Sequence, residues 1–391
     1  MTFTRSRSYL LVLLIGALVA PLWAAELPAV RPAAVGMEAD TLAQIPVQLK
    51  ELVAKQRIAG AVTLTLRHGK VVEFDAVGMA DLENKRTMRK DSVFWIASMT
   101  KPIVATSVML LVHEGKLSLD EPASRFIPAF KQVKLRNGQT PAREITVRDL
   151  LSHTAGLAQP NRQPHDMSQS LANYTSYLLR NPLNFEPGSQ YEYGFGLTIA
   201  GRIVEAVSGL PYAQFLEERL FKPLGMKNST FWPNADQRRR MAKTYKQDEQ
   251  KRLAPAICHF LTPDETIRPE PEPSGGLFST AQDYATFLQM IANGGEWNGV
   301  RLLSKQAVDE MTRPHVINGQ PLGYGLGWAQ VRRPANAPGL SGFGHGGAFS
   351  TNGLIDPQRG LVTVLMIQRT LFDNGGDVLN TFQDLVFKAV K

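Results

Sequence analysis

The pattern of apolar and polar residues predicts strands near both ends of the chain. Runs rich in Val, Thr and Phe at 61–67 and 71–78 flank the turn His68-Gly69-Lys70 and indicate a β-hairpin. Three further strand candidates follow late in the chain, at 324–328, 343–348 and 361–367. Because the strand candidates cluster at the two ends, we expect one sheet that both ends of the chain build together.

Helical spacing of apolar residues marks the other ordered segments. The expected helices cover 37–56, about 98–112, 197–207, 281–292 and 377–390. Glycines such as Gly115 and Gly209 stand where helix C-termini are expected. The segment 231–273 is charged and rich in proline, so it should cross the surface. Helices would thus pack on the sheet, and a mainly helical region at about 116–274 would form one wall of a cleft.

The composition is that of an ordinary globular protein. The chain has 391 residues, of which 43% are hydrophobic and 20% charged, enough for one large domain or two interleaved ones. Its formal net charge of +8 is spread along the chain, without basic runs that interleave with aromatics. The densest basic patch, Arg238-Arg239-Arg240, is expected on a solvated loop or a helix end. No nucleic-acid partner is therefore expected.

The first 25 residues have the layout of a secretory signal. Arg5 and Arg7 precede an apolar segment at 9–19, and cleavage is expected after Ala24 or Ala25. The domain 26–391 would then be exported, to the periplasm or outside the cell. The residue three places before the cut is large rather than small, so an uncleaved membrane anchor stays open. No later run approaches the roughly 20 apolar residues of a membrane-spanning helix.

Ser98 and Lys101 are the first candidates for chemistry. They stand three residues apart at the expected start of a helix, which places a hydroxyl beside an amine on one face. The apolar residues that follow would bury the lysine and lower its pKa, so that it could take the serine proton. The helix N-terminus would favour an oxyanion at the serine. The same spacing also arises by chance, and a serine there is often only a helix cap.

Other polar residues offer weaker candidates. The neighbours Ser152 and His153 are unsuited to act as nucleophile and base, so we expect His153 to hold a loop by hydrogen bonds. Tyr193, beside Gly194 and just before a helix, either reaches into a cleft or packs in a tight turn. Cys258 is the only cysteine, which excludes an internal disulfide. It is also a poor candidate for a nucleophile. The seven histidines form no metal-ligand motif, and no cofactor is expected.

Taken in order, Ser98-Met99-Thr100-Lys101, the loop around Tyr193 and His345-Gly346-Gly347 resemble the serine β-lactamase and penicillin-binding protein superfamily. The likeness is closest to class C β-lactamases and the related class VIII esterases. It runs from about 60 to 368, with supporting segments at 150–157, 187–188, 274–277 and 323–328. It implies an α/β (α+β) fold of β-lactamase/transpeptidase type. An antiparallel sheet from about 30–115 and 275–391 would be flanked by helices, with the helical and loop region 116–274 inserted.

The resemblance also implies roles for individual residues. Ser98 would be the acylated nucleophile and Lys101 its base or proton shuttle. Tyr193 would be the second acid and base, with its phenolate form favoured by the lysine charge. The backbone N–H groups of Ser98 and Ala348 would form an oxyanion hole.

Two departures from the family pattern point to uncharged, apolar substrates. Phe195 stands where the β-lactamases have an asparagine that contacts the lysine and the substrate amide. His345 begins the counterpart of the family's Lys-Thr-Gly strand, with Gly346 and Gly347, and would supply only part of a lysine's charge at neutral pH. These residues are the expected substrate contacts. We therefore expect a carboxylesterase or acyl transferase that acts on a small-molecule ester. The alternatives are a β-lactamase or D-amino-acid peptidase or amidase on the same residues, and a catalytically silent cell-envelope binding protein.

Overall fold

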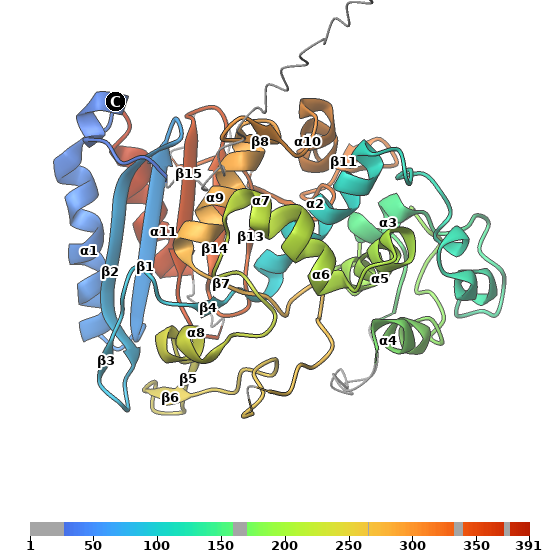
Figure 1. The fold of residues 1–391 in the computed structure, drawn as a ribbon, viewed down its shortest axis with the longest axis horizontal. Coiled ribbons are helices and arrows are strands. Elements are labelled where there is room, and N and C mark those ends of the chain that lie inside the picture. Colours follow the sequence, from blue (N-terminus) through green and yellow to red (C-terminus); the bar gives the residue numbers. More distant parts are fainter. Residues whose placement is uncertain (1–26, 159–169, 265, 332–338, 371–375) are drawn as a thin grey trace, which may run out of the picture.

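A large antiparallel sheet lies at one side of the molecule (Figure 1). The computed structural model describes residues 27–158, 170–264, 266–331, 339–370 and 376–391. Within them the sheet has seven strands in the order β12-β13-β14-β15-β1-β2-β3. The strands are β1 (Gly60–Arg67), β2 (Lys70–Asp81), β3 (Arg86–Thr87), β12 (Ala329–Val331), β13 (Gly342–Gly346), β14 (Asn352–Asp356) and β15 (Leu361–Met366). Because β1 pairs antiparallel with β15, the prediction of one sheet from both chain ends is confirmed.

Helices cover both faces of this sheet. The helices α1 (Ala39–Ala54) and α11 (Gly376–Lys388) pack together on one face, and α9 (Ala281–Ala292) packs on the other. Alternate residues of β1 explain this layering, since Ala61 belongs to the core under α1 whereas Val62 and Leu64 belong to the larger core on the opposite face. The sheet is therefore buried on both sides.

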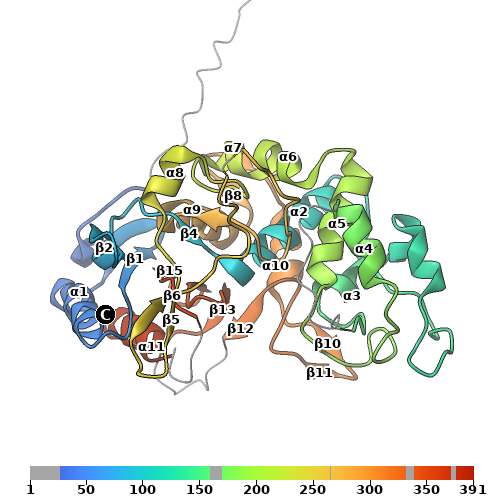
Figure 2. The same ribbon diagram turned by 90° about the horizontal axis from the view of Figure 1, so that it is seen from below.

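The helix α2 (Thr100–His113) lies between the sheet and a helical region (Figures 1 and 2). Every residue from Thr100 to Leu111 is buried, as expected for a helix that is apolar all round. The region beyond it contains α3 (Val147–Leu151), α4 (Leu171–Leu178), α5 (Gly196–Ser208) and α6 (Tyr212–Leu216). The short helices α7 (Lys222–Leu224) and α8 (Ala235–Arg240) follow along the chain and lie back toward the sheet. The helix α5 packs on α2 and α3. The first turn of α2 thus stands where the sheet meets the helical region.

Short elements connect these layers. The remaining helix is α10 (Lys305–Thr312), which packs on α2. The short strand pairs are β4 (Phe94–Trp95) with β7 (Phe278–Ser279), β5 (Tyr245–Gln247) with β6 (Leu253–Pro255), β8 (Glu296–Trp297) with β9 (Val300–Arg301), and β10 (Val316–Ile317) with β11 (Gln320–Pro321). The basic patch Arg238-Arg239-Arg240 forms the end of α8, one of the two predicted settings.

One strand prediction is wrong. Tyr324 to Trp328 form no regular strand, and β12 begins only at Ala329. A Cβ at Gly325 would lie 2.6 Å from the carbonyl oxygen of Arg313, and Gly327 has φ of +78°. The two glycines let this segment turn tightly while Trp328 enters the core. Its alternation of glycine and large residues reflects that turn rather than a pleated strand.

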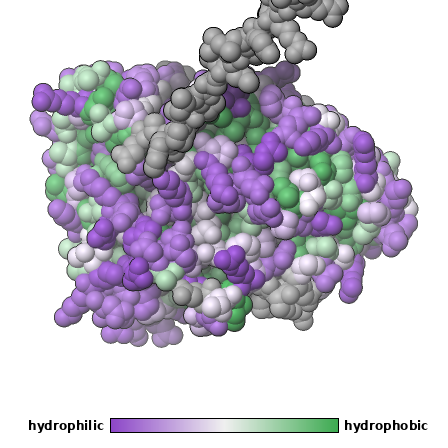
Figure 3. All heavy atoms as spheres, in the orientation of Figure 1, coloured by the Kyte–Doolittle hydropathy of each residue, from purple (hydrophilic) through white to green (hydrophobic). Residues whose placement is uncertain are grey.

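The predicted signal segment, residues 1–25, lies outside the described residues. No helix in the described ranges has the length and apolar character needed to cross a membrane. On the face seen in Figure 3, hydrophilic side chains predominate and hydrophobic ones gather in separate groups.

Candidate active site

Ser98 lies on a short 3-10 turn, Ala97–Met99, between β4 and the first turn of α2. The entry to this turn is fixed, because the N–H of Ile96 donates a hydrogen bond to the carbonyl oxygen of Leu277 at 3.0 Å. Ala97 adopts φ of +46°, a conformation that residues other than glycine rarely adopt. Backbone strain of this kind persists where surrounding contacts impose it, as they do at many functional sites. The turn thus presents Ser98 at the start of the buried helix.

Lys101 and Tyr193 both donate hydrogen bonds to the hydroxyl of Ser98. The distances to Ser98 Oγ are 3.1 Å from Lys101 Nζ and 3.0 Å from the Tyr193 hydroxyl. The ammonium group also lies over the tyrosine ring, 4.8 Å from its centroid. The prediction that a hydroxyl and an amine share one face of this helix is therefore confirmed, and Tyr193 reaches into the site.

Burial changes the proton affinity of both partners of Ser98. It lowers the pKa of Lys101 from 10.5 to about 8, and the charge of Glu272 opposes this shift. Tyr193 as a whole residue is 41% exposed, but desolvation at its hydroxyl raises its pKa, and the hydrogen bond to Ser98 offsets this only in part. The expected phenolate is therefore corrected to a neutral phenol, because loss of water around the oxygen raises its pKa more than the hydrogen bond with Ser98 lowers it.

A buried carboxylate stands behind Lys101, and sequence reasoning missed it. Glu272 Oε1 accepts hydrogen bonds from the Thr198 hydroxyl and from the N–H of Ser274, both at 2.7 Å. The carbonyl oxygen of Ser274 in turn accepts a hydrogen bond from Lys101 Nζ at 2.9 Å. The only sequence signal was the position of Glu272 just before the 274–277 segment. Lys101 is thus held between Ser98 and a carbonyl that Glu272 helps to fix.

His345 on β13 forms the opposite side of the site. Its Nδ1 lies 2.7 Å from the carbonyl oxygen of Gly346. Because a carbonyl oxygen can only accept a hydrogen bond, Nδ1 carries the proton. Its Nε2 then accepts a hydrogen bond from the Tyr324 hydroxyl at 3.0 Å. Burial, reinforced by the charge of Lys101, lowers the pKa of His345 to about 3. The expected partial charge on His345 is therefore wrong: the ring is neutral at physiological pH.

Ser98 and Ala348, the expected oxyanion-hole residues, line one cavity. No hydrogen bond from either N–H group to a backbone carbonyl is found in the described part of the chain. Close approach brings them together, since a Cβ at Gly347 would lie 2.5 Å from the carbonyl oxygen of Ile96. The end of β13 can therefore lie against the Ser98 turn only because residue 347 is glycine.

The cavity beside Ser98 has a volume of about 510 Å³. Its described lining includes the predicted residues Tyr193 and 345–348. Asn352 and Leu379, which were not predicted, also line it. None of these described lining side chains is charged. Phe195 is not among them, because it precedes α5 and its ring meets Tyr174 edge-on at 6.4 Å. A larger cavity of about 690 Å³ lies between α9, α10 and the sheet and contains none of the predicted site residues.

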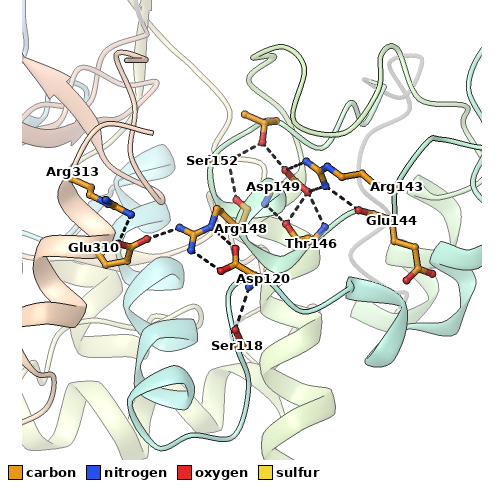
Figure 4. Close-up of polar contacts among 11 residues, drawn as sticks. Ser118, Asp120, Arg143, Glu144, Thr146, Arg148, Asp149, Ser152, Glu310 and Arg313 are labelled. Carbon is orange, nitrogen blue, oxygen red and sulfur yellow. Dashed lines mark hydrogen bonds and ion pairs between the residues drawn. The ribbon is translucent and has the colours of Figure 1, made fainter. Parts of the chain in front are cut away.

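Buried polar contacts hold the segment that follows α3 (Figure 4). Asp149 accepts hydrogen bonds from both Nη atoms of Arg143, at 2.6 and 2.9 Å, and from the Thr154 hydroxyl at 3.1 Å. Ser152 donates to the carbonyl oxygen of Arg148 at 2.8 Å rather than pairing with a base. The prediction that the neighbouring histidine holds a loop is confirmed by the bond that Gly194 N–H donates to its ring.

Other nucleophile and metal candidates find no support. Cys258 is free, and burial raises the pKa of its thiol to about 12. Among the residues that the structure describes, no group of three or more His, Cys, Asp or Glu side chains could hold a metal ion.

The arrangement around Ser98 is suited to acyl transfer. An amine of lowered pKa and a phenol lie within hydrogen-bond distance of the Ser98 hydroxyl oxygen. Ser98 and Ala348, whose backbone N–H groups are the expected oxyanion hole, line the same cavity. Such a set can form and break an ester with the serine.

Comparison with known proteins gives the same picture. The family model described as Beta-lactamase matches residues 48–386. Protein Rv1367c of Mycobacterium tuberculosis (strain ATCC 25618 / H37Rv) is 32% identical over 358 residues, which cover 82% of this chain and 88% of that protein. Esterase EstB of Burkholderia gladioli is 28% identical over 397 residues, covering 91% of this chain and 98% of that protein.

A solved structure has the same fold. That of EstCE1, described as a hydrolase with promiscuous acyltransferase activity, matches with a TM-score of 0.75 and 27% identity, covering 89% of this chain and 99% of that one. The comparisons therefore confirm the resemblance that the motifs indicated and the expected fold class.

Proposed function

The chain belongs to the β-lactamase family and is a serine hydrolase, and we propose that it cleaves, or transfers the acyl group of, small uncharged carboxylic esters. One observation carries this proposal: no charged side chain is found among the described residues that line the cavity beside Ser98, where His345 is neutral. A substrate carboxylate would lose its water there without a charged lining side chain to pair with, which is costly, and the amine of Lys101 is already hydrogen-bonded to Ser98 and to the Ser274 carbonyl. The activities named for EstB and EstCE1 support ester chemistry.

In the first half-reaction the oxygen of Ser98 attacks the ester carbonyl carbon. The serine proton passes to the neutral amine of Lys101, and the carbonyl oxygen becomes an oxyanion that the N–H groups of Ser98 and Ala348 receive. The bond to the leaving oxygen then breaks, and that oxygen takes the proton of the Tyr193 hydroxyl. An alcohol leaves, and the acyl group remains on Ser98.

In the second half-reaction the phenolate of Tyr193 takes a proton from water or from an acceptor alcohol. The resulting oxygen nucleophile attacks the acyl carbon, and the Ser98 oxygen leaves with the proton that Lys101 holds. All three side chains return to their starting protonation states. Water yields the free acid, whereas an alcohol yields a new ester.

Matched substrates test the preference for uncharged acyl groups. We expect kcat/KM for p-nitrophenyl butyrate to exceed that for the p-nitrophenyl monoester of succinic acid by at least about tenfold, because the second carries a carboxylate into the neutral cavity. His345→Lys adds a cation there and should narrow the ratio. A wild-type preference for the charged ester would contradict the proposal.

An amide substrate is the alternative on the same residues. This alternative predicts that the protein turns over a chromogenic cephalosporin faster than the neutral ester. Such a result would contradict the esterase proposal and favour a β-lactamase or amidase. A protein that turns over neither substrate, and whose Ser98 no fluorophosphonate phosphonylates, would refute both.

A further inference from the structure

We propose that His153 is a positioning residue for Tyr193. It would fix the phenol beside Ser98 by holding the chain on both sides of Tyr193 and by packing on the tyrosine ring. The inference rests on the proposed function, in which Tyr193 carries a proton to the leaving group.

Three contacts join His153 to the tyrosine segment. The N–H of Glu192 donates a hydrogen bond to the carbonyl oxygen of His153 at 2.9 Å, and the N–H of Gly194 donates one to His153 Nδ1 at 3.2 Å. The two rings lie 4.4 Å apart between centroids, at an interplanar angle of 38°. Because Nδ1 accepts an N–H, the imidazole is the neutral form with its proton on Nε2. The contacts thus involve the residues before and after Tyr193 as well as its ring.

His153 is itself held firmly. Its side chain and backbone are buried, with 3% exposure, and its φ of +59° is one that residues other than glycine rarely adopt. The next residue, Thr154, is tied to Asp149 through both its N–H, at 2.9 Å, and its hydroxyl, at 3.1 Å. Asp149 is anchored by Arg143, as Figure 4 shows. The residue that follows His153 is therefore tied into a hydrogen-bond network with Asp149 and Arg143.

Such support matters because Tyr193 lies in a segment without regular secondary structure. Its hydroxyl must stay near the 3.0 Å observed from Ser98 Oγ to exchange protons with reacting groups there. A displacement of about 1 Å at a reacting group can lower a rate about a hundredfold. His153 therefore acts through Tyr193 and has no reacting atom of its own.

Three substitutions separate the contribution of the His153 acceptor nitrogen from that of its ring. His153→Asn keeps a short acceptor and suits the positive φ, His153→Phe keeps a ring without an acceptor, and His153→Ala removes both. We expect His153→Ala and His153→Phe to lower kcat for p-nitrophenyl butyrate by at least about tenfold, with KM within about threefold of wild type. His153→Asn should recover most of the loss.

His68→Asn is the matched control, since His68 also has a positive φ, of +50°, but lies in the hairpin turn between β1 and β2. Its kcat should equal that of the wild type. Thermal unfolding followed by circular dichroism verifies that each variant is folded. If His153→Ala does not fold, the comparison of His153→Asn with His153→Phe tests the role of the acceptor nitrogen. Equal kcat for these two variants would overturn that role.

A double-mutant cycle with Tyr193→Phe tests whether His153 acts through the phenol. In the Tyr193→Phe background, His153→Ala should lower kcat by at most about a further twofold. The same loss in both backgrounds, with Tyr193→Phe itself impaired, would overturn the positioning role and leave the proposed function standing. Wild-type kcat in Tyr193→Phe would instead refute the proposed role of Tyr193, and with it this inference.

Discussion

Replacing Glu272 by glutamine should shift the pH profile of ester hydrolysis to lower pH. Glutamine can keep the acceptor oxygen that binds Thr198 and Ser274, so the carbonyl oxygen that receives Lys101 Nζ at 2.9 Å should stay in place. What disappears is the negative charge, which raises the pKa of Lys101 against the larger effect of burial. The amine of the variant should therefore lose its proton at lower pH.

The size of the effect follows from the pKa of Lys101, which is about 8. At about pH 7 only about one-tenth of such an amine is neutral, and only the neutral form can accept the serine proton. The wild-type kcat/KM should thus rise about tenfold from about pH 7 to a plateau above about pH 9. In Glu272→Gln the midpoint of the pH profile moves to lower pH. At about pH 7 kcat/KM can rise by at most about tenfold over wild type, because the neutral fraction of Lys101 cannot exceed one.

The assay is kcat/KM for p-nitrophenyl butyrate between about pH 5.5 and pH 9.5, the range that brackets the lysine titration. Glu73→Gln is the matched control. Glu73 is another buried carboxylate that accepts hydrogen bonds from two hydroxyls, those of Thr63 and Thr65, but it lies in the sheet on β2. Its profile should match the wild type. A midpoint that stays in place or moves up in Glu272→Gln would refute the electrostatic coupling between Glu272 and Lys101.

Three further substitutions probe other parts of the account. Gly347→Ala places a methyl group 2.5 Å from the carbonyl oxygen of Ile96, so it should displace the β13 end and lower kcat about a hundredfold on aryl esters. Burial raises the pKa of Glu73 from 4.5 to about 7, so native stability falls as pH rises through that window. Glu73→Gln should therefore stabilise the fold at about pH 8 by up to about 3 kcal/mol and leave it unchanged near pH 4, as urea unfolding would measure. Asp149→Ala leaves Arg143 without its carboxylate partner and removes the Asp149 half of the capping box at the start of α3, so it should cost about 3 kcal/mol in the same assay.

The sequence predicted those features that depend on local spacing. Ser98 and Lys101 meet because they are three residues apart at the start of one helix, and that geometry needs no tertiary information. The prediction of one sheet from both chain ends followed from the position of the strand-like runs, and the pairing of β1 with β15 confirms it. Tyr193 could be placed in a loop before α5, although its proximity to Ser98 came only from the family resemblance.

The features that sequence reasoning missed depend on burial and on distant contacts. Glu272 acts on Lys101 across 171 positions of the chain, and no local pattern marks such a pair. The protonation of Tyr193 and His345 was misjudged because the sequence shows their neighbours but not how completely the fold removes water from them. Phe195 was assigned to the cavity by alignment of a motif, whereas the start of α5 directs its ring toward Tyr174.

The most direct test of the mechanism is to look for the acyl-enzyme itself. Wild-type protein and Ser98→Ala are mixed briefly with p-nitrophenyl butyrate, quenched in acid and weighed by intact-mass spectrometry, while released nitrophenol is followed in parallel. We expect a burst of nitrophenol and a transient butyryl adduct on the wild type, mapped to Ser98 by peptide analysis, and neither in Ser98→Ala. Equal nitrophenol release by the two proteins, or an adduct on another residue, would contradict the assignment of Ser98 as the nucleophile.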